Sequence, residues 1–236
     1  MIVYFESLPS TNAFLKEEAK KGAPNYYTVI ADRQTSGRGR MGRSFYSDNG
    51  GLYMSFLIRN VDDVDVTRIT AAAGVSVVEA IKKKYGVSCC IKWVNDLIYN
   101  GKKVCGILAE GVISENGKID GVVVGIGVNI APPKDGFNEE IKDIAGAISD
   151  HYSETERNDL AKAIIEYFDK NITLPDLIDK YRALSTVIGK DVRVITPNSS
   201  YDARAIGIDD EFGLTVITDD GKEKTLRSGE ISIRTK

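Results

Sequence analysis

The sequence contains one histidine and three cysteines among 236 residues. A single histidine excludes a histidine-rich metal centre and weighs against a Ser-His-Asp triad, and His151 lies in a polar stretch that predicts a surface loop. No Cys-x-x-Cys pair is present, so neither a zinc site nor a redox dithiol is indicated. We interpret Cys89, Cys90 and Cys105 as buried thiols, as is typical of a cytoplasmic protein, and we expect no metal site.

Long apolar runs and a strong net charge are also absent. No run of about 18 consecutive apolar residues occurs, and the first six residues lack the basic start and apolar length of a signal peptide. A formal net charge of −3 and a pI near 5.4 argue against a surface built to hold nucleic acid. We therefore expect a cytoplasmic protein with no membrane segment and no specific nucleic-acid partner.

Apolar periodicity predicts alternating strands and helices in the first three quarters of the chain. Strands are expected over residues 2–6, 26–31 and 52–58, with a helix between a polar N-cap at residues 10–12 and a stop at Gly22, and another over 66–85. Residues 89–130 have a strand pattern with turn signals at 100–101 and 115–117, which predict consecutive hairpins. A capping box from Ser153 to Glu156 opens a further helix, and a short helix is expected over 175–184.

After Gly189 the pattern changes to short strands separated by polar turns. These are expected over residues 191–195, 201–208, 214–218, 224–226 and 231–234. Eight basic and nine acidic residues from Lys190 onward give no sign of a nucleic-acid surface. We expect a small β-barrel here, which divides the chain into domains of residues 1–185 and 186–236.

The stretch from Arg33 to Arg43 places four arginines and three glycines directly after a predicted strand. Glycine lets the backbone approach a ligand closely, and guanidinium groups match phosphate and carboxylate oxygens. The spacing Gly-x-Gly-x-x-Gly fits a dinucleotide fingerprint, but residues 43–51 cannot supply the helix that this fingerprint needs. Neither a P-loop nor a protein-kinase catalytic loop is present. An anion-binding loop, a solvated arginine-rich turn and a nucleic-acid contact remain open from these residues alone.

A second polar group follows between Lys92 and Lys103. The two lysines flank the pair Asn95–Asp96, and this pattern is also compatible with two ordinary turns and exposed lysines. Gly106 and Gly111 in the next strand predict a bulge or a place where a ligand lies against the backbone, and Gly125-Ile126-Gly127 repeats the spacing. Because neighbouring residues of a strand face opposite ways, Lys102 should point away from Lys103.

Five segments in this order resemble the biotin protein ligases. They are Ser-Thr-Asn at 10–12, the Gln-x-x-Gly-Arg-Gly-Arg-x-Gly-Arg loop from 34, Lys-Trp-x-Asn-Asp at 92–96, Gly-Lys-Lys-x-x-Gly-Ile-Leu at 101–108 and Gly-Ile-Gly-Val-Asn at 125–129. The resemblance covers residues 1 to about 185, and the tail is similar to the family's small C-terminal domain. It implies an α+β fold, with a mixed sheet flanked by helices as in class II aminoacyl-tRNA synthetases, plus an SH3-like β-barrel.

The resemblance also implies a reaction. Biotin would be activated with ATP and Mg²⁺ to biotinyl-5′-AMP and then joined to a lysine of a biotin carboxyl carrier protein or domain of a biotin-dependent carboxylase. A homodimer is possible in this family. The form expected here is the monofunctional one, because only nine residues precede Ser10 and leave no room for an N-terminal DNA-binding domain.

The same resemblance assigns roles by position. Biotin would contact Ser10, Thr11, Asn12, Gln34, Arg38, Gly39, Arg40, Lys103 and Gly106. ATP or the adenylate would contact Arg38, Arg40, Arg43, Phe45, Lys92, Lys103 and Asn129. The catalytic residues would be Lys103, Asp96, Arg38 and Asn95, with Lys103 at the reacting carboxylate and Asp96 accepting a proton from the acceptor lysine. Two positions depart from the family: Val94 replaces the usual proline, and Phe45 appears where tryptophan is common.

Three alternatives remain at this stage. A lipoate protein ligase has the same fold, although the Arg-Gly-Arg loop favours biotin. A biotin-sensing transcriptional regulator would need a DNA-binding domain. A non-catalytic interaction module would not need Lys103, Asp96 and the basic loop together.

Overall fold

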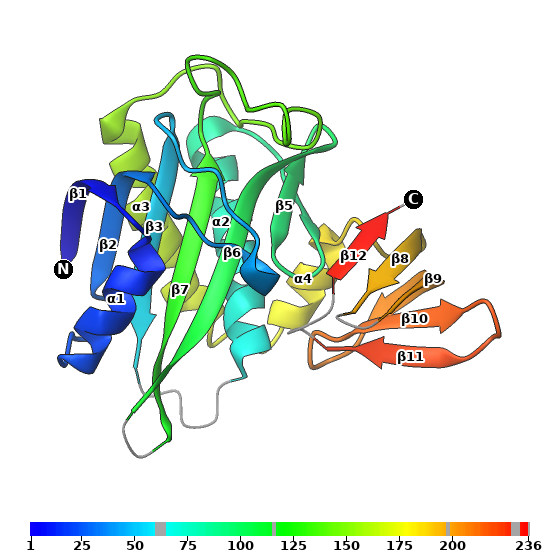
Figure 1. Ribbon diagram of the computed structural model, residues 1–236. Helices are drawn as coiled ribbons and strands as arrows, with labels where there is room; N and C mark the ends of the chain where they lie inside the picture. Colours follow the sequence, from blue (N-terminus) through cyan, green and yellow to red (C-terminus); the bar gives the residue numbers. More distant parts are fainter. Residues whose placement is uncertain (60–64, 115–116, 197–198, 228–231, 236) are drawn as a thin grey trace.

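The chain forms a seven-stranded sheet followed by a smaller five-stranded sheet. Figure 1 shows helices against the larger sheet and the smaller sheet at its side. The structure is a computed structural model that describes all residues except 60–64, 115–116, 197–198, 228–231 and 236. The α+β fold with a separate β-rich C-terminal part is therefore confirmed.

The large sheet has the strand order β1-β2-β3-β7-β6-β5-β4. Of the strand pairs that the structure describes in this sheet, the edge pair β1–β2 is parallel and the others are antiparallel. The strands are β1 Ile2–Leu8, β2 Thr28–Gln34, β3 Gly51–Ile58, β4 Cys90–Lys92, β5 Asp96–Tyr99, β6 Lys102–Ile113 and β7 Ile119–Asn129. β7 lies in the middle, which explains its nearly continuous apolar run, since both of its faces are covered.

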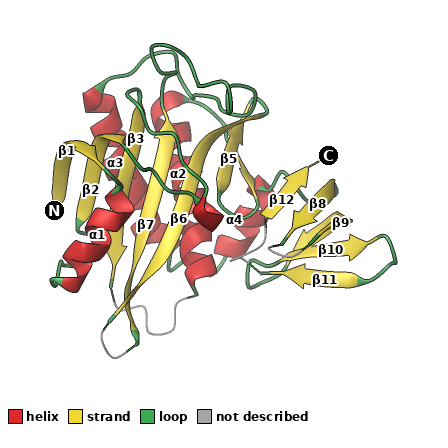
Figure 2. Ribbon diagram, viewed as in Figure 1, coloured by secondary structure: helices red, strands yellow, loops and turns green. Residues whose placement is uncertain are grey.

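Helices cover the two faces of this sheet unequally (Figure 2). Three of them lie on one face: α2 Val66–Tyr85, α3 Glu154–Asn171 and α4 Leu177–Leu184. α2 begins at the cap Asp65, whose side chain accepts a hydrogen bond from the Thr67 N–H, and ends at Gly86 in the left-handed conformation. Its apolar surface packs on alternate residues of the sheet such as Ile30 and Phe56 and forms the main core.

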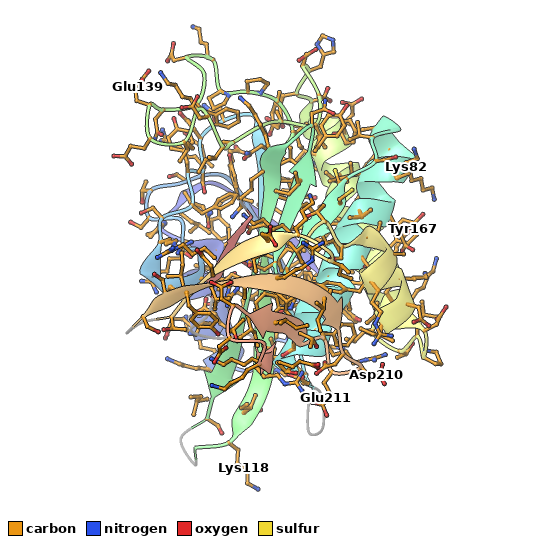
Figure 3. All side chains as sticks on the ribbon, turned by 90° about the vertical axis from the view of Figure 1, so that its right-hand side faces the viewer. Lys82, Lys118, Glu139, Tyr167, Asp210 and Glu211 are labelled. Carbon is orange, nitrogen blue, oxygen red and sulfur yellow. The ribbon has the colours of Figure 1, made fainter. Side chains whose placement is uncertain are left out.

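In the described part of the chain, the opposite face of the sheet carries α1 Thr11–Lys20 and two long loops. Leu15 and Ala19 of α1 pack on Val29 and Val123 in a second, smaller core. Much of this face is therefore left to the loop after β2 and to the segment after β7. In Figure 3, Glu139 of that segment and Lys118 of the β6–β7 hairpin lie at opposite ends of the molecule.

The C-terminal sheet has the strand order β11-β10-β9-β8-β12 and is antiparallel throughout. Its strands are β8 Asp191–Ile195, β9 Ser200–Ile208, β10 Leu214–Thr218, β11 Glu223–Leu226 and β12 Ser232–Thr235. The turn before β10 holds it to the rest of the chain: the Trp93 indole N–H donates to the Phe212 carbonyl (2.9 Å), and Arg182 pairs with Asp210 (2.7 Å). Asp210 and Glu211 of this turn are labelled in Figure 3.

Most predicted elements are present with shifted ends. The turn at Asn100–Gly101 has both residues at positive φ, 49° and 77°, as a tight hairpin requires. The Ser153 side chain caps α3 by accepting from the Glu156 N–H. Two of the three residues predicted for the turn at 115–117, and the first residue of the strand predicted at 231–234, lie outside the described part of the chain.

The expectation that all three cysteines are buried is wrong for one of them. Cys89 and Cys105 are buried, but Cys90 is exposed. Cys90 is the first residue of β4, and its neighbour Ile91 faces the core. β4 is the edge strand of the large sheet, and Cys90 lies on the face opposite to the core-facing side chain of Ile91, where it is exposed.

Among the described residues, none of the helices combines the length and the apolar character needed to span a membrane.

Candidate active site

A cavity of about 800 Å³ opens on the face of the sheet that carries α1. Its walls come from the start of α1, the loop after β2, the strands β4 to β7 and the segment after β7. All fifteen residues predicted from the sequence line it: Ser10, Thr11, Asn12, Gln34, Arg38, Gly39, Arg40, Arg43, Phe45, Lys92, Asn95, Asp96, Lys103, Gly106 and Asn129. The fold therefore brings five separate sequence segments to one place.

The floor of the cavity is a glycine pair covered by an aromatic ring. Gly106 of β6 lies directly opposite Gly127 of β7, and a Cβ at either position would collide with the ring of Phe45. The ring also packs edge-on against Tyr53, with 6.4 Å between centroids. The close backbone approach predicted at Gly106 is thus used by Phe45 in this structure. No bulge occurs there, since the register shifts fall at Leu97/Ile98 and Val112/Ile113.

One end of the cavity is built from neutral polar side chains. The Thr11 N–H and hydroxyl donate to Gln34 Oε1 (2.8 and 3.1 Å), and Ser55 Oγ lies 2.8 Å from Thr11 Oγ1 and 2.6 Å from Asn12 Oδ1. Three of these contacts join two oxygens: Thr11 with Gln34, Ser55 with Thr11, and Ser55 with Asn12. Only two hydroxyl hydrogens, one from Thr11 and one from Ser55, are available for them. One contact therefore lacks a hydrogen, and this end of the cavity can accept an N–H from a ligand.

Two further residues of this end are already engaged within the protein. The Ser10 hydroxyl caps α1 by accepting from the Ala13 N–H (3.4 Å). Asn12 donates both of its amide hydrogens, to the Leu108 carbonyl (3.2 Å) and to Glu110 Oε2 (2.8 Å). The amide oxygen is therefore the group with which Asn12 can contact a ligand. Gln34 donates one amide hydrogen, from Nε2 to Ser47 Oγ (2.9 Å), and keeps a second one for a ligand.

The other end of the cavity is strongly basic. Five basic and two acidic side chains line the cavity, an excess of three positive charges in a chain whose formal net charge is −3. Arg40 donates to Asn95 Oδ1 (3.2 Å). Burial lowers the pKa of the Arg40 guanidinium, while the charge of Asp96 opposes this shift and the neighbouring Arg43 adds to it. A bound anion would offset the cost of burying this cation.

The arginine loop has a defined conformation. The Gly39 N–H donates to the Arg43 carbonyl (2.7 Å), and a single turn of 3-10 helix, η1 Arg40–Gly42, forms the tip. Met41 and Gly42 have positive φ, 57° and 71°. This turn directs several cationic side chains into one cavity without a helix N-terminus, in agreement with the rejection of the dinucleotide fingerprint.

Lys103 and Asp96 form an ion pair at the wall of the cavity. Lys103 Nζ lies 2.6 Å from Asp96 Oδ1, and the two side chains are 35% and 27% exposed. Asp96 Oδ1 has no hydrogen bond of good alignment, so this contact is ionic and the oxygen can still accept a proton or a hydrogen bond. Lys102 points elsewhere, as predicted, and donates to the Lys142 carbonyl (3.0 Å).

The segment after β7 holds Lys103 from the other side. The Lys103 N–H donates to the Ile144 carbonyl (2.7 Å), and the Gly146 N–H donates to the Lys103 carbonyl (2.9 Å). Asn129 joins this arrangement through its amide, which donates to the Gly146 carbonyl (2.9 Å). Phe137, with Ile141 and Ile144, also lines the cavity here. The sequence analysis missed this apolar wall, since a loop of mixed composition gives no periodic signal.

The turn before Asn95, where Val94 departs from the family pattern, is buried. Val94 is 2% exposed, and the Tyr181 hydroxyl donates to its carbonyl (2.9 Å). The Trp93–Val94 peptide bond is cis. The Trp93 indole donates to the turn before β10, as described above, so the turn at Val94 is fixed by contacts to both parts of the chain.

Two polar residues behind the neutral end were also missed. Ser55 is fully buried in the otherwise apolar strand β3, and Glu110 lies in the middle of β6. A signal was available, because a hydroxyl in a buried strand or a carboxylate in a central one needs a partner. Only the three-dimensional structure shows that the partner of both is Asn12.

Comparison with known proteins identifies the family. Residues 4–129 match the biotin/lipoate A/B protein ligase family, and residues 187–234 match the biotin protein ligase C terminal domain. The chain is 36% identical to the bifunctional ligase/repressor BirA of Bacillus subtilis, over 98% of this chain and 74% of that protein. It is 30% identical to the biotin–[acetyl-CoA-carboxylase] ligase of Mycobacterium tuberculosis, over 94% of this chain and 85% of that protein.

The structure agrees with this result. The biotin protein ligase of Aquifex aeolicus, solved in complex with biotin and ATP, superimposes with a TM-score of 0.83 at 28% identity and covers 100% of this chain and 99% of that one. The small C-terminal sheet corresponds to the SH3-like domain expected from the sequence. The chain therefore belongs to the biotin protein ligases of the biotin/lipoate A/B protein ligase family.

Proposed function

We propose that this protein is a biotin protein ligase that uses ATP to form biotinyl-5′-AMP and transfers biotin to a lysine of a biotin carboxyl carrier protein or domain. One observation carries the proposal: a single cavity joins an acceptor-rich neutral end to an end with an excess of cations, beside the Lys103–Asp96 pair. The polar groups of biotin match these two ends, because it carries a ureido ring at one end and a carboxylate at the other.

In the proposed binding mode, the ureido ring lies at the neutral end. Ser10, Thr11, Asn12 and Gln34 contact it, and the missing hydrogen among Thr11, Ser55 and Asn12 is supplied by a ureido N–H. Gly106 lies under the ligand once Phe45 has left the glycine floor. A polar ring buried in this way is held only if each of its donors and acceptors finds a partner.

The cationic end then serves the first half-reaction. A biotin carboxylate oxygen attacks the α-phosphorus of ATP, a P–O bond forms, and the bond to pyrophosphate breaks. Arg38, Arg40 and the Gly39 backbone hold the carboxylate and the phosphate, and Lys103 balances the charge that develops between them. Arg43, Lys92, Phe45 and Asn129 contact the nucleotide.

Mg²⁺ is proposed to enter as part of the ATP substrate. Within the described residues, no group of three or more His, Cys, Asp or Glu side chains is arranged to hold a metal ion. We therefore assign no protein ligand to Mg²⁺ and place it on the phosphates of the nucleotide.

The ion pair provides a link between the two half-reactions. When Lys103 moves to the new carboxylate–phosphate centre, Asp96 loses its cation and is free to receive the ammonium of the acceptor lysine. Asp96 takes a proton from that group, with Asn95 beside it. The amine nitrogen then attacks the biotinyl carbonyl carbon, the C–O bond to AMP breaks, and the second proton of the nitrogen passes to the departing AMP phosphate.

A lipoate ligase is the alternative within the same fold family. The match of residues 187–234 to the biotin protein ligase C terminal domain supports biotin over lipoate. The domain boundary between residues 185 and 186, a homodimer, a cytoplasmic location and the lack of a specific DNA partner stay predictions.

The decisive experiment incubates the protein with biotin, ATP, Mg²⁺ and a biotin carrier domain and weighs the carrier by mass spectrometry. We expect a gain of one biotinyl group, no gain when the acceptor lysine of the carrier is replaced by arginine, and no gain with lipoate. A lipoylated carrier, or an unmodified one in the presence of biotin, would refute the proposed function.

A further inference from the structure

Glu110 connects the outer surface of β6 to the back of the cavity. Its Oε1 accepts from Lys16 Nζ at 3.2 Å, and its Oε2 accepts from Asn12 Nδ2 at 2.8 Å. The Glu110 side chain is 24% exposed, and Glu110 is absent from the residues that line the cavity in the described part of the chain. An acidic side chain in a central strand thus has one partner at the surface and one inside.

These contacts decide which way the Asn12 amide points. A carboxylate and a carbonyl can only accept hydrogen bonds, so Glu110 and Leu108 both require the NH₂ group of Asn12. Rotating the amide by half a turn would bring its oxygen against both acceptors. The oxygen therefore points to Ser55, which donates to it at 2.6 Å.

The far side of the amide is kept open for this orientation. A Cβ at Gly125 of β7 would collide with Asn12 Oδ1, so only glycine lets the amide lie flat on the strand. Asn12 is 5% exposed and cannot turn to water as an alternative. The amide oxygen is consequently held in one position, beside the oxygens of Thr11 and Ser55.

We propose that Glu110 is a positioning residue for biotin recognition. By holding both hydrogens of the Asn12 amide together with Leu108, it fixes Asn12 Oδ1 as part of the acceptor edge that receives a ureido N–H. Glu110 acts through Asn12 and does not touch the substrate. This inference rests on the proposed function and assigns a determinant of biotin binding that lies behind the cavity.

The hydrogen bond from Asn12 to Glu110, and not the ion pair of Glu110 with Lys16, should determine the effect of Glu110 on biotin binding. Lys16 and Glu110 are 33% and 24% exposed, and partly exposed ion pairs contribute little because water and salt screen them. Lys16→Met should therefore change the KM for biotin by less than about 3-fold. It serves as a matched control on the same carboxylate.

The test compares Glu110→Ala, Glu110→Met and Glu110→Gln with wild type in steady-state biotinylation of a carrier domain. Loss of one hydrogen bond to a charged group, acting indirectly, should raise the KM for biotin about 3- to 30-fold in the Ala and Met variants. The KM for ATP and kcat should change little. Gln at 110 keeps an acceptor for Asn12 and should restore the KM for biotin to within about 3-fold of wild type.

A ligand variant separates positioning from general damage. Biotin methylated at each ureido nitrogen in turn should bind wild type more weakly when the methyl replaces the N–H that Asn12 receives. The same methylation should cost less in Glu110→Ala, because the acceptor is already misplaced and the two losses are not additive. Thermal denaturation checks the fold, and the Met variant keeps the side-chain length if the Ala variant is unstable.

The outcomes separate this inference from the proposed function. A wild-type protein that does not biotinylate the carrier overturns the proposed function itself. A wild-type protein that does so, with the Ala and Met variants showing a normal KM for biotin, or equal rises in the KM for biotin and ATP, overturns the role of Glu110 alone. Failure of Gln to restore binding would also contradict it.

Discussion

Replacing Lys103 by alanine tests the chemistry of the cationic end most directly. Lys103 Nζ lies at the head of β6, 2.6 Å from Asp96, and its backbone is held on both sides by the segment after β7. The side chain is a compact and mobile cation that can follow negative charge from the biotin carboxylate to the forming anhydride. Its removal should leave the fold nearly intact, because the backbone bonds remain and the side chain is one-third exposed.

The loss of rate expected for Lys103→Ala follows from the charge of the lysine and its surroundings. A cation about 4 Å from a unit of developing negative charge contributes roughly 4 kcal/mol at an effective dielectric constant of about 20. Partial exposure and the loss of the Asp96 contact reduce this value, which leaves about 3 kcal/mol, the scale of one lost oxyanion donor. Since charge develops mainly in the transition state, adenylate formation should slow roughly 10²- to 10³-fold while biotin affinity changes less.

Lys102→Ala is the matched control, because Lys102 points to the Lys142 carbonyl and not into the cavity. The assay is pyrophosphate release at saturating biotin and ATP, with biotin affinity measured separately. We expect Lys102→Ala to be near normal. If Lys102→Ala were the impaired variant, the orientation of the strand would be wrong, and if both variants were normal, the charge argument would fail.

Three further results are expected. Biotin and ATP together should stabilise the fold more than either alone: at a hundred times Kd, binding adds about 2.7 kcal/mol, or roughly 5–10 °C in Tm for a chain of this size. A rise in Tm with lipoate and ATP beyond that with ATP alone, and no such rise with biotin and ATP, would contradict the substrate. At pH 8, iodoacetamide should alkylate Cys90 alone in the native protein. Burial raises the pKa of Cys89 to about 12 and that of Cys105 well above its usual value, so both of these thiols stay protonated. Rapid alkylation of the Cys90→Ser variant would refute this prediction. Duplex DNA should bind with Kd no tighter than about 10⁻⁴ to 10⁻⁶ M at physiological salt, and a sequence-specific gel shift would revive a regulatory role.

The sequence was most informative where local rules act alone. The N-cap at Ser10, the cap of α3 at Ser153 and the Asn100–Gly101 turn each depend on a few neighbouring residues, and each is in the structure. The strand pattern of residues 89–130 likewise predicts consecutive hairpins, and β5–β6 and β6–β7 pair as antiparallel neighbours. Element ends were less certain, because capping side chains and sheet register decide them together.

Contacts between individual side chains of different segments could not be predicted from local sequence patterns. The resemblance to the family collected fifteen of the lining residues, but the ion pair between Lys103 and Asp96, which are seven positions apart, could not be predicted from the sequence between them. Neither could the contact of Glu110 with Asn12, which joins residues 98 positions apart. The Cys90 error has a similar origin, since the exposure of one face of β4 follows from its place at the edge of the sheet, which the sequence alone did not give.

The glycines at 106 and 127 show what a local sequence pattern can and cannot predict. Gly106 and Gly127 indicate that something large lies against the backbone of two neighbouring strands, and they say nothing about its identity. In the structure it is the ring of Phe45, which comes from the arginine loop and packs edge-on against Tyr53. A ligand that uses the same floor has to displace this ring. The Phe45 N–H donates to the Gly37 carbonyl (2.9 Å), so the backbone that carries this ring is hydrogen-bonded to the arginine loop.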